Sequence, residues 1–229
     1  MLARLETQHE VIAVDLPGHG DTPRLPDGQP PTVSALTDTV EAFLDGIGVA
    51  RPRVAGNSMG GWIALELARR RRAGATVALS PAGFWTRRES AYANRLFIES
   101  RRTLGLLGPV APAMCATAAG RTALTGLFYA RPWRLRPEDA AAAVRNFVRC
   151  PGLQTTREQL FAEHFHGGDE LHGDIVIGWG ARDRVLLPRQ GRRAAAAVKG
   201  ARLVELPGLG HVPMGDDPER VAELILGAG

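Results

Sequence analysis

Short apolar runs alternate along the chain with longer stretches of helical periodicity. The apolar runs occupy residues 10–16, 53–56, 75–80, 174–179 and 201–206. Continuous rather than alternating apolarity is typical of strands buried on both faces of a parallel sheet. Apolar positions at helical spacing occupy residues 32–46, 62–72, 190–199 and 217–226. This order predicts the α/β class, with a mostly parallel sheet flanked by helices.

One long segment lacks any strand pattern. Residues 84–173 contain helical patterns instead, notably at 92–103 and 137–149. Because this segment stands between two predicted strands, we expect a helical cap inserted into the sheet domain. The predicted core then comprises residues 1–83 and 174–229, and the cap comprises residues 84–173.

Length and composition fit a folded globular chain. The 229 residues are 45% hydrophobic and 23% charged, which excludes the disordered class. The two cysteines, Cys115 and Cys150, form neither a disulfide framework nor a zinc-binding pattern. No metal or cofactor is expected.

The basic charge does not by itself indicate nucleic acid. The net charge is +4, but Lys199 is the only lysine and the longest basic run, residues 69–72, ends a helical pattern. Cations there complement the helix dipole. Since no basic patch is interleaved with aromatic residues, we do not expect nucleic acid as a partner.

Neither the N-terminus nor the longest uncharged stretch predicts a membrane protein. The first residues lack the apolar segment of a secretory signal. Residues 103–120 carry no charge, but Gly105, Gly108, Pro109 and Pro112 interrupt them, which favours short buried helices over a span. We therefore expect a cytoplasmic protein that does not bind membranes.

The most specific chemical signal is a serine between glycines. Gly56 and Gly60 flank Ser58 in a G-x-S-x-G pattern, which lies between a predicted strand and a predicted helix. Such a turn strains the serine backbone and exposes its hydroxyl, and glycines relieve the crowding. At the helix N-terminus, the backbone N–H of Met59 can stabilise an oxyanion.

A serine nucleophile requires a base, and six histidines are candidates. Three lie in or just after the predicted cap (His164, His166, His172), His9 lies near the start, and His19 lies in a Pro-Gly-His-Gly turn. His211 alone follows a predicted strand that ends at the same sheet edge as Ser58. We expect His211 to be the base.

The base in turn needs an orienting carboxylate. Asp183 follows the predicted strand 174–179, whereas no acid follows the strand 75–80 closely. The order Ser58, Asp183, His211 is the one found in α/β-hydrolases. An ion pair of Asp183 with Arg182 or Arg184 is the structural alternative.

The chain resembles the α/β-hydrolase superfamily in four segments that occur in the expected order. They are Asp15-Leu16-Pro17-Gly18-His19-Gly20, Gly56-Asn57-Ser58-Met59-Gly60-Gly61, Trp179-Gly180-Ala181-Arg182-Asp183 and Gly210-His211-Val212-Pro213-Met214. The turn that carries Ser58, which we call the elbow, and the segment Ser80-Pro81-Ala82-Gly83 resemble the same segments of one group within the superfamily. That group is the carbon–carbon bond hydrolases that cleave ring-fission products. Serine at the elbow differs from the aspartate of dehalogenase-like and epoxide-hydrolase-like members.

The resemblance also implies strands that are missing from this chain. Family members begin with a hairpin and a further strand that runs into a His-Gly loop, which supplies a second oxyanion N–H. Only nine residues precede the predicted strand 10–16, and three strands with turns need roughly 20 or more. A start site assigned too far downstream is our interpretation.

These observations predict a serine hydrolase with Ser58, Asp183 and His211 as catalytic residues. Its substrate would be a small ester, thioester, lactone or diketone. Met59 and Asn57 are expected at the oxyanion or substrate. Trp62, Phe84 and Trp85 are expected near the pocket, with core packing as the alternative for Trp62 and Phe84. The cap residues Phe97, Leu106 and Leu107 are further candidates for the pocket wall.

The alternative function is that of a truncated or impaired homologue that acts as a binding protein. Nothing in the sequence indicates the oligomeric state.

Overall fold

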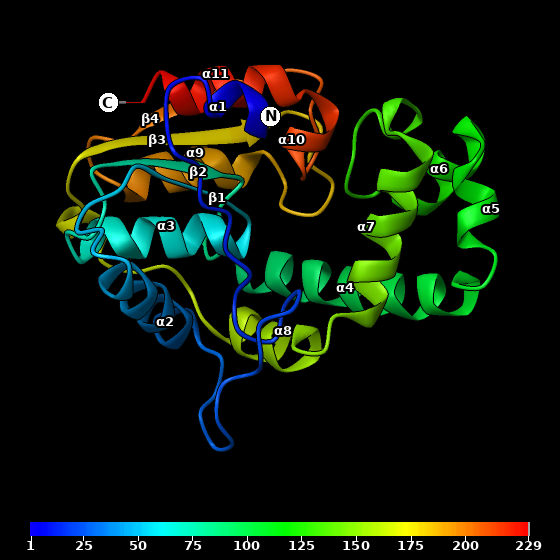
Figure 1. Cartoon of the computed structure of the whole chain (residues 1–229), viewed down its shortest axis with the longest axis horizontal. Helices are drawn as coiled ribbons and strands as arrows, with labels where there is room; N and C mark the ends of the chain where they lie inside the picture. Colours follow the sequence, from blue (N-terminus) through cyan, green and yellow to red (C-terminus); the bar gives the residue numbers. More distant parts are fainter. Residues whose placement is uncertain (229) are drawn as a thin grey trace.

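The sheet has four parallel strands in the order β1-β2-β3-β4 (Figure 1). The computed structural model describes residues 1–228, so Gly229, the last residue of the predicted core, lies outside the described residues. The strands are β1 Val54–Asn57, β2 Ala75–Leu79, β3 Asp174–Gly180 and β4 Arg202–Leu206. Their parallel direction brings all four carboxyl ends to one edge of the sheet, where loops carry ligand sites in open α/β sheets.

Alternate side chains of the two central strands, β2 and β3, enter two different cores. Ile175 and Ile177 pack on one face of β3 and Val176 on the other, as the two-residue period of a strand requires. Both faces of β2 and β3 are therefore buried, which explains the continuous apolar runs at residues 75–80 and 174–179.

Helices cover both faces of the sheet (Figure 1). On one face lie α3 (Met59–Arg69) and α9 (Arg189–Ala197), with α2 (Val33–Gly46) packed outside α3. On the other face lie α11 (Pro218–Leu226) and the short α1 (Leu2–Leu5). The predicted helices 32–46, 62–72, 190–199 and 217–226 are all present, although α3 begins three residues earlier than the pattern indicated.

The segment between β2 and β3 is helical, as the sequence predicts. It contains α4 (Arg87–Leu107), α5 (Ala111–Cys115), α6 (Ala118–Thr125), α7 (Pro137–Arg149), α8 (Leu153–Ala162), and the 3₁₀ turns η1 (Pro132–Arg134) and η2 (Gly168–Glu170). A separate apolar cluster forms among α4 to α7, around Leu104, Cys115 and Val144. The last short helix, α10 (Pro213–Asp216), follows the β4 loop.

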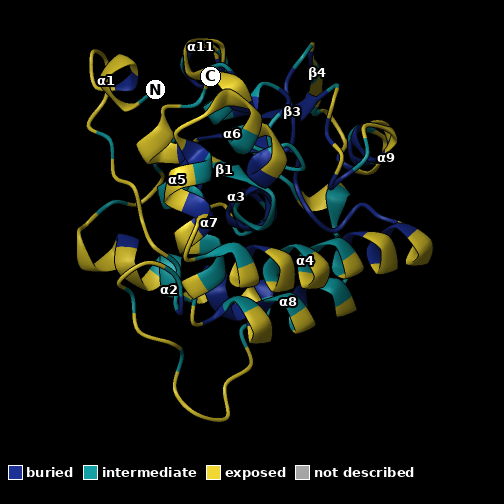
Figure 2. Ribbon diagram, turned by 90° about the vertical axis from the view of Figure 1, so that its right-hand side faces the viewer, coloured by how far each residue is buried: buried dark blue, intermediate teal, exposed yellow. Residues whose placement is uncertain are grey.

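The prediction of a strand at residues 10–16 is wrong. These residues run extended but pair with no strand, and Figure 2 shows the connection from α1 to α2 as largely exposed. An apolar groove of about 430 Å³ separates them from β1 and α3; Ile12 and Val14 line it and are each nearly half exposed. A strand requires a hydrogen-bonded neighbour about 4.8 Å away, and across this groove the segment has none.

Among residues 1–228, no helix has the length and apolar character needed to cross a bilayer.

Candidate active site

Ser58 lies on a strained turn between β1 and α3. Its backbone has φ 56° and ψ −116°, a region that residues other than glycine rarely adopt. A Cβ atom on Gly56 would lie 2.0 Å from the carbonyl oxygen of Gly60, whereas a Cβ on Gly60 would meet nothing within 4 Å. The turn therefore requires glycine at position 56, and close packing does not impose the second glycine of the pattern.

The N-terminus of α3 presents an unused donor beside Ser58. Met59 is the first residue of the 11-residue helix, and among residues 1–228 no acceptor is bonded to its backbone N–H. Free N–H groups at a helix N-terminus, together with the helix dipole, favour negative charge. The arrangement can stabilise an oxyanion that forms next to the Ser58 hydroxyl.

His211 and Asp183 are in direct contact. The Nδ1 atom of His211 lies 2.8 Å from Oδ2 of Asp183, and both side chains are almost fully buried. The other carboxylate oxygen of Asp183 accepts hydrogen bonds from the backbone N–H groups of Val185 (2.9 Å) and Leu186 (2.8 Å). The carboxylate is thus fixed in orientation, and it fixes the imidazole ring with Nε2 free. This contact replaces the alternative ion pair with Arg182 or Arg184.

Asn57 joins the serine turn to the histidine loop. Its Nδ2 atom donates to the carbonyl oxygens of His211 (2.9 Å) and Leu79 (3.0 Å). Asp216 braces the same loop, because its carboxylate accepts the backbone N–H of Gly210 at 2.7 Å. Asn57 therefore holds two backbone segments together, although it also lines the cavity described next.

A cavity of about 390 Å³, which we call the elbow cavity, opens at Ser58. The predicted residues Asn57, Ser58, Met59 and His211 all line it, and Asp183 lies behind His211, outside the lining. The remaining walls are mostly apolar; they comprise Leu16, His19, Gly60, Phe97, Phe128, Phe147, Leu153, Thr156, Arg157, Leu160, Phe161 and Val212.

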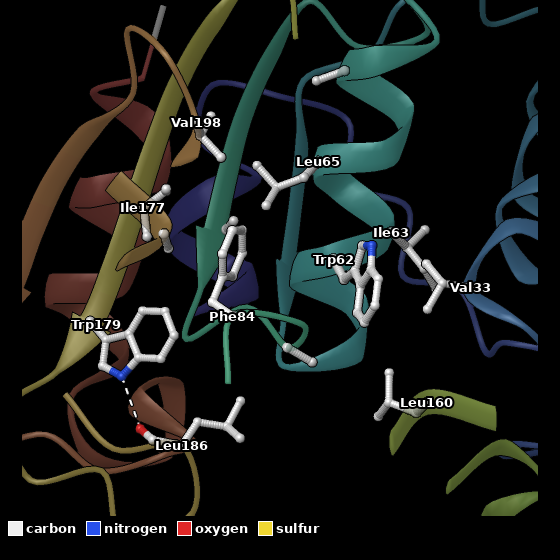
Figure 3. Packing of buried hydrophobic residues seen from close by; sticks show 14 of the residues in the cluster. Val33, Trp62, Ile63, Leu65, Phe84, Leu160, Ile177, Trp179, Leu186 and Val198 are labelled. Carbon is white, nitrogen blue, oxygen red and sulfur yellow. Dashed lines mark hydrogen bonds between the residues drawn. The ribbon is translucent and has the colours of Figure 1, made fainter. Parts of the chain in front are cut away.

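Trp62, Phe84 and Trp85 lie in the core and do not line the elbow cavity. Each is at most 6% exposed, and Figure 3 shows Trp62 and Phe84 among the packed residues of the sheet and α3. Trp62 and Trp85 meet edge to face, with ring centroids 6.3 Å apart. The structure thus agrees with the packing alternative for Trp62 and Phe84. Of the cap candidates, Phe97 lines the cavity, and Leu106 is 77% exposed.

Sequence reasoning missed the residues that give the cavity its apolar character. Phe97, Phe128, Phe147 and Phe161 form a cage in which Phe97 lies 5.8–6.1 Å from the other three rings. Phe97, Phe147 and Phe161 lie at helical positions that resemble core positions, and Phe128 lies in a turn after α6, so no local signal distinguished them. His19, in the Pro-Gly-His-Gly turn, also lines the cavity, and its Nδ1 lies 3.2 Å from the Pro17 carbonyl oxygen.

The other histidines do not assemble a metal site. Within the described part of the chain, no group of three or more His, Cys, Asp or Glu side chains is placed to hold a metal ion.

Comparison with known proteins identifies the fold and the family. The model of the alpha/beta hydrolase family matches residues 1–224. Epoxide hydrolase EphH of Mycobacterium tuberculosis is 30% identical over 200 residues, which make up 84% of this chain and 92% of that protein. A pimeloyl-acyl-carrier protein methyl ester esterase of Neisseria meningitidis is 27% identical over 232 residues, covering 98% of this chain and 84% of that protein.

Solved structures share the same architecture. A meta-cleavage product hydrolase of Pseudomonas fluorescens superimposes with a TM-score of 0.72 at 19% identity, over 98% of this chain and 81% of that one. The enol-lactonase of Burkholderia xenovorans gives a TM-score of 0.67 at 22% identity, over 93% of this chain and 77% of that one. Because the family model covers nearly the whole chain, this chain belongs to the alpha/beta hydrolase family.

Proposed function

We propose that the chain is a serine hydrolase that cleaves a small carbonyl substrate through an acyl-enzyme. The observation that carries this proposal is a single cavity lined by Ser58, on a strained turn, and by His211, whose ring Asp183 holds at 2.8 Å. A nucleophile, a base and an orienting acid are the minimum set for acyl transfer through serine.

The proposed reaction begins when Ser58 Oγ attacks the carbonyl carbon and His211 Nε2 takes the hydroxyl proton. The negative charge that develops on the carbonyl oxygen faces the N–H of Met59. His211 then gives its proton to the leaving group as the bond to the carbonyl carbon breaks. Water, deprotonated by His211, attacks the acyl-enzyme, and Ser58 recovers its proton as the acid is released.

The apolar cage of the elbow cavity supports a substrate with a hydrophobic chain or ring. An ester or thioester, a lactone and a diketone all present an electrophilic carbonyl of suitable size. The relatives include proteins named as a methyl ester esterase and an epoxide hydrolase, and enol-lactonase and meta-cleavage product hydrolase structures share the fold. We favour an ester or thioester, because the esterase match extends over nearly the whole chain.

Epoxide hydrolysis fits this chain less well despite the match to EphH. Attack of a carboxylate on an epoxide gives an ester, which water then cleaves. Attack by Ser58 would give an ether, which has no carbonyl for water to attack, and the enzyme would stall. The serine at the elbow therefore supports carbonyl chemistry.

Domain organisation, location and partners belong to the same proposal. Residues 84–173 would act as a cap over the elbow cavity, because α4, α7 and α8 supply three of its four phenylalanines, and residues 1–83 and 174–229 would form the core. We further propose a cytoplasmic enzyme that acts on a small molecule without a metal or cofactor.

Active-site labelling tests the proposal. A fluorophosphonate probe should label the chain, and p-nitrophenyl acetate or butyrate should be hydrolysed. Ser58→Ala should abolish both while leaving the thermal melting temperature unchanged within about 2 °C. Ser90→Ala changes a buried serine on α4 outside the cavity and should retain labelling. Labelling that persists in Ser58→Ala would overturn the assignment. A folded chain that neither labels nor hydrolyses esters would favour the binding-protein alternative.

A further inference from the structure

A second cavity of about 380 Å³ lies between α4 and α8. We call it the arginine pocket; its walls include Phe97, Ile98, Arg101 and Arg102 of α4, and Leu153 and Arg157 of α8. Three of these residues, Phe97, Leu153 and Arg157, also line the elbow cavity. The two cavities are therefore neighbours that share a wall.

The arginine pocket is strongly cationic. No acidic side chain lines it, and among residues 1–228 neither Arg101 nor Arg102 pairs with a carboxylate. Arg101 donates to the carbonyl oxygen of Cys150 at 3.3 Å, which directs its guanidinium along the pocket wall. Glu158 of α8 is half exposed and lies 3.3 Å from both Arg157 and Gln154. Within the described residues, Arg157 is thus paired with a carboxylate, whereas Arg101 and Arg102 are not.

Charge along the whole chain points to the same region. The arginines of residues 84–173 outnumber the acidic residues there by four, which equals the entire net charge of the chain. The excess of positive charge thus lies within the segment 84–173, which also supplies the walls of the arginine pocket.

Arg157 lies at the junction of the two cavities, because it lines both. Its guanidinium donates to Asn94 and Glu158, and its side chain is 16% exposed. A ligand that extends from one cavity into the other therefore passes a cationic side chain.

We propose that the arginine pocket binds an anionic group, a carboxylate or a phosphate, at the far end of the substrate's acyl chain. The reacting carbonyl lies at Ser58, the apolar chain lies in the phenylalanine cage, and the charged end contacts Arg101, Arg102 and Arg157. Guanidinium groups bind both anions through charge-assisted hydrogen bonds. This inference rests on the proposed function, since it names the substrate class of that site.

Turnover measurements test the chain end directly. Mono-p-nitrophenyl esters of dicarboxylic acids, from succinate to suberate, are compared with neutral p-nitrophenyl esters of equal chain length. We expect kcat/KM for the anionic series to exceed that of the neutral series at one optimal length. The double variant Arg101→Gln/Arg102→Gln should reduce this preference about ten- to a hundred-fold, mainly through KM, and 0.5 M NaCl should also weaken it.

The matched control changes charge equally on the same helix. Arg88 and Arg95 are exposed on α4 and line neither cavity, so Arg88→Gln/Arg95→Gln should retain the preference. An equal loss in both double variants would show a general charge effect and overturn the proposal. Identical length dependence of the two ester series would overturn it as well.

A binding measurement separates this inference from the proposed function. Calorimetry on Ser58→Ala with octanoate, octyl phosphate and octanol needs no turnover. We expect at least one anion to bind tenfold more tightly than octanol and to lose that advantage in Arg101→Gln/Arg102→Gln; the tighter anion identifies carboxylate or phosphate as the natural group. Equal binding of all three ligands overturns the proposal that the arginine pocket binds an anion, even if the wild-type chain hydrolyses esters. A preference for an anion, together with a wild-type chain that hydrolyses no ester, supports the arginine pocket and rejects the serine mechanism.

Discussion

The two glycines that flank Ser58 lie in different surroundings, and their substitution should have opposite effects. Gly56→Ala places a Cβ 2.0 Å from the Gly60 carbonyl oxygen, so the turn must open, with a loss of about 1–3 kcal/mol in the free energy of unfolding. Gly60 lies within α3 with open space beside it, and Gly60→Ala should stabilise the chain by about 0.5–1 kcal/mol. Urea denaturation of both variants measures the difference. Equal destabilisation by both would contradict this geometry.

The hydrogen bonds of Asp183 predict the consequence of replacing it with asparagine. In Asp183→Asn, Oδ1 can still accept from Val185 and Leu186, which leaves the amide NH₂ facing His211 Nδ1. The amide NH₂ can only donate, so Nδ1 of His211 must accept and the imidazole proton moves to Nε2. A protonated Nε2 can no longer accept the proton of Ser58. We expect kcat for p-nitrophenyl esters to fall about 10³–10⁴-fold, with KM and melting temperature little changed. An unchanged kcat would show that another group orients the base.

At this scale the sequence indicated the candidate site residues but not the pocket. Ser58, Asp183 and His211 each follow a strand in a short, recognisable pattern, so local chemistry and strand order were enough to predict that Asp183 contacts His211 and that Ser58 lines the same cavity as His211. The phenylalanine cage depends instead on how the cap helices pack. Phe128, for example, lies outside any helix and meets Phe97 and Phe147 only in three dimensions.

Among the elements, α2 and α3 are joined by an ion-pair cluster around the buried carboxylate of Glu66. Glu66 of α3 accepts hydrogen bonds from Arg69 (2.6 Å) and Arg70 (2.9 Å), and Arg70 reaches Glu41 of α2 at 2.6 Å. Burial alone would raise the pKa of Glu66, but the two guanidinium groups outweigh burial and lower it. The run of arginines at residues 69–72 is therefore partly a clamp between helices and not only a solvated helix end.

This clamp makes part of the stability depend on pH. Because the pKa of Glu66 is lower in the folded than in the unfolded chain, its contribution is complete above the unfolded pKa and is lost as the pH falls through the folded value. Glu66→Gln should cost about 1–3 kcal/mol at pH 7, and the difference from wild type should shrink below about pH 4. Urea titrations at several pH values measure it, with the exposed Glu99→Gln as the control. A difference that grows on acidification would contradict the assignment.

Elements were predictable where local signals decide them. The helix α2 begins at Thr32, whose side chain accepts the N–H of Ala35, and α4 begins with a capping box between Thr86 and Glu89; such caps are encoded in neighbouring residues. A strand, by contrast, needs a partner that is distant in sequence. Residues 10–16 have the composition of a strand, but composition does not supply the partner.

For the whole molecule, the groove beside β1 separates the hydrogen-bonded sheet from a segment without backbone hydrogen-bond donation. On one side lie strands β2 and β3, buried on both faces and paired with neighbours on both edges. On the other side lies the segment 10–16, whose backbone N–H groups donate to no acceptor among residues 1–228. The central part of the sheet should therefore open only with global unfolding, whereas this segment needs no opening at all.

Hydrogen–deuterium exchange followed by peptide mass spectrometry tests this division. Peptides covering residues 10–16 should exchange within seconds at pH 7, and those covering β2 and β3 should stay protected for hours. The short α5, which packs in the separate cap cluster, should be intermediate, because that cluster can open while the sheet remains intact. Slow exchange at residues 10–16 would mean that the segment pairs with β1 in solution, as the sequence pattern indicates, and that the groove closes. Fast exchange at residues 10–16 in a chain that hydrolyses esters would show that the four-stranded sheet alone is enough to assemble the serine turn and the histidine loop.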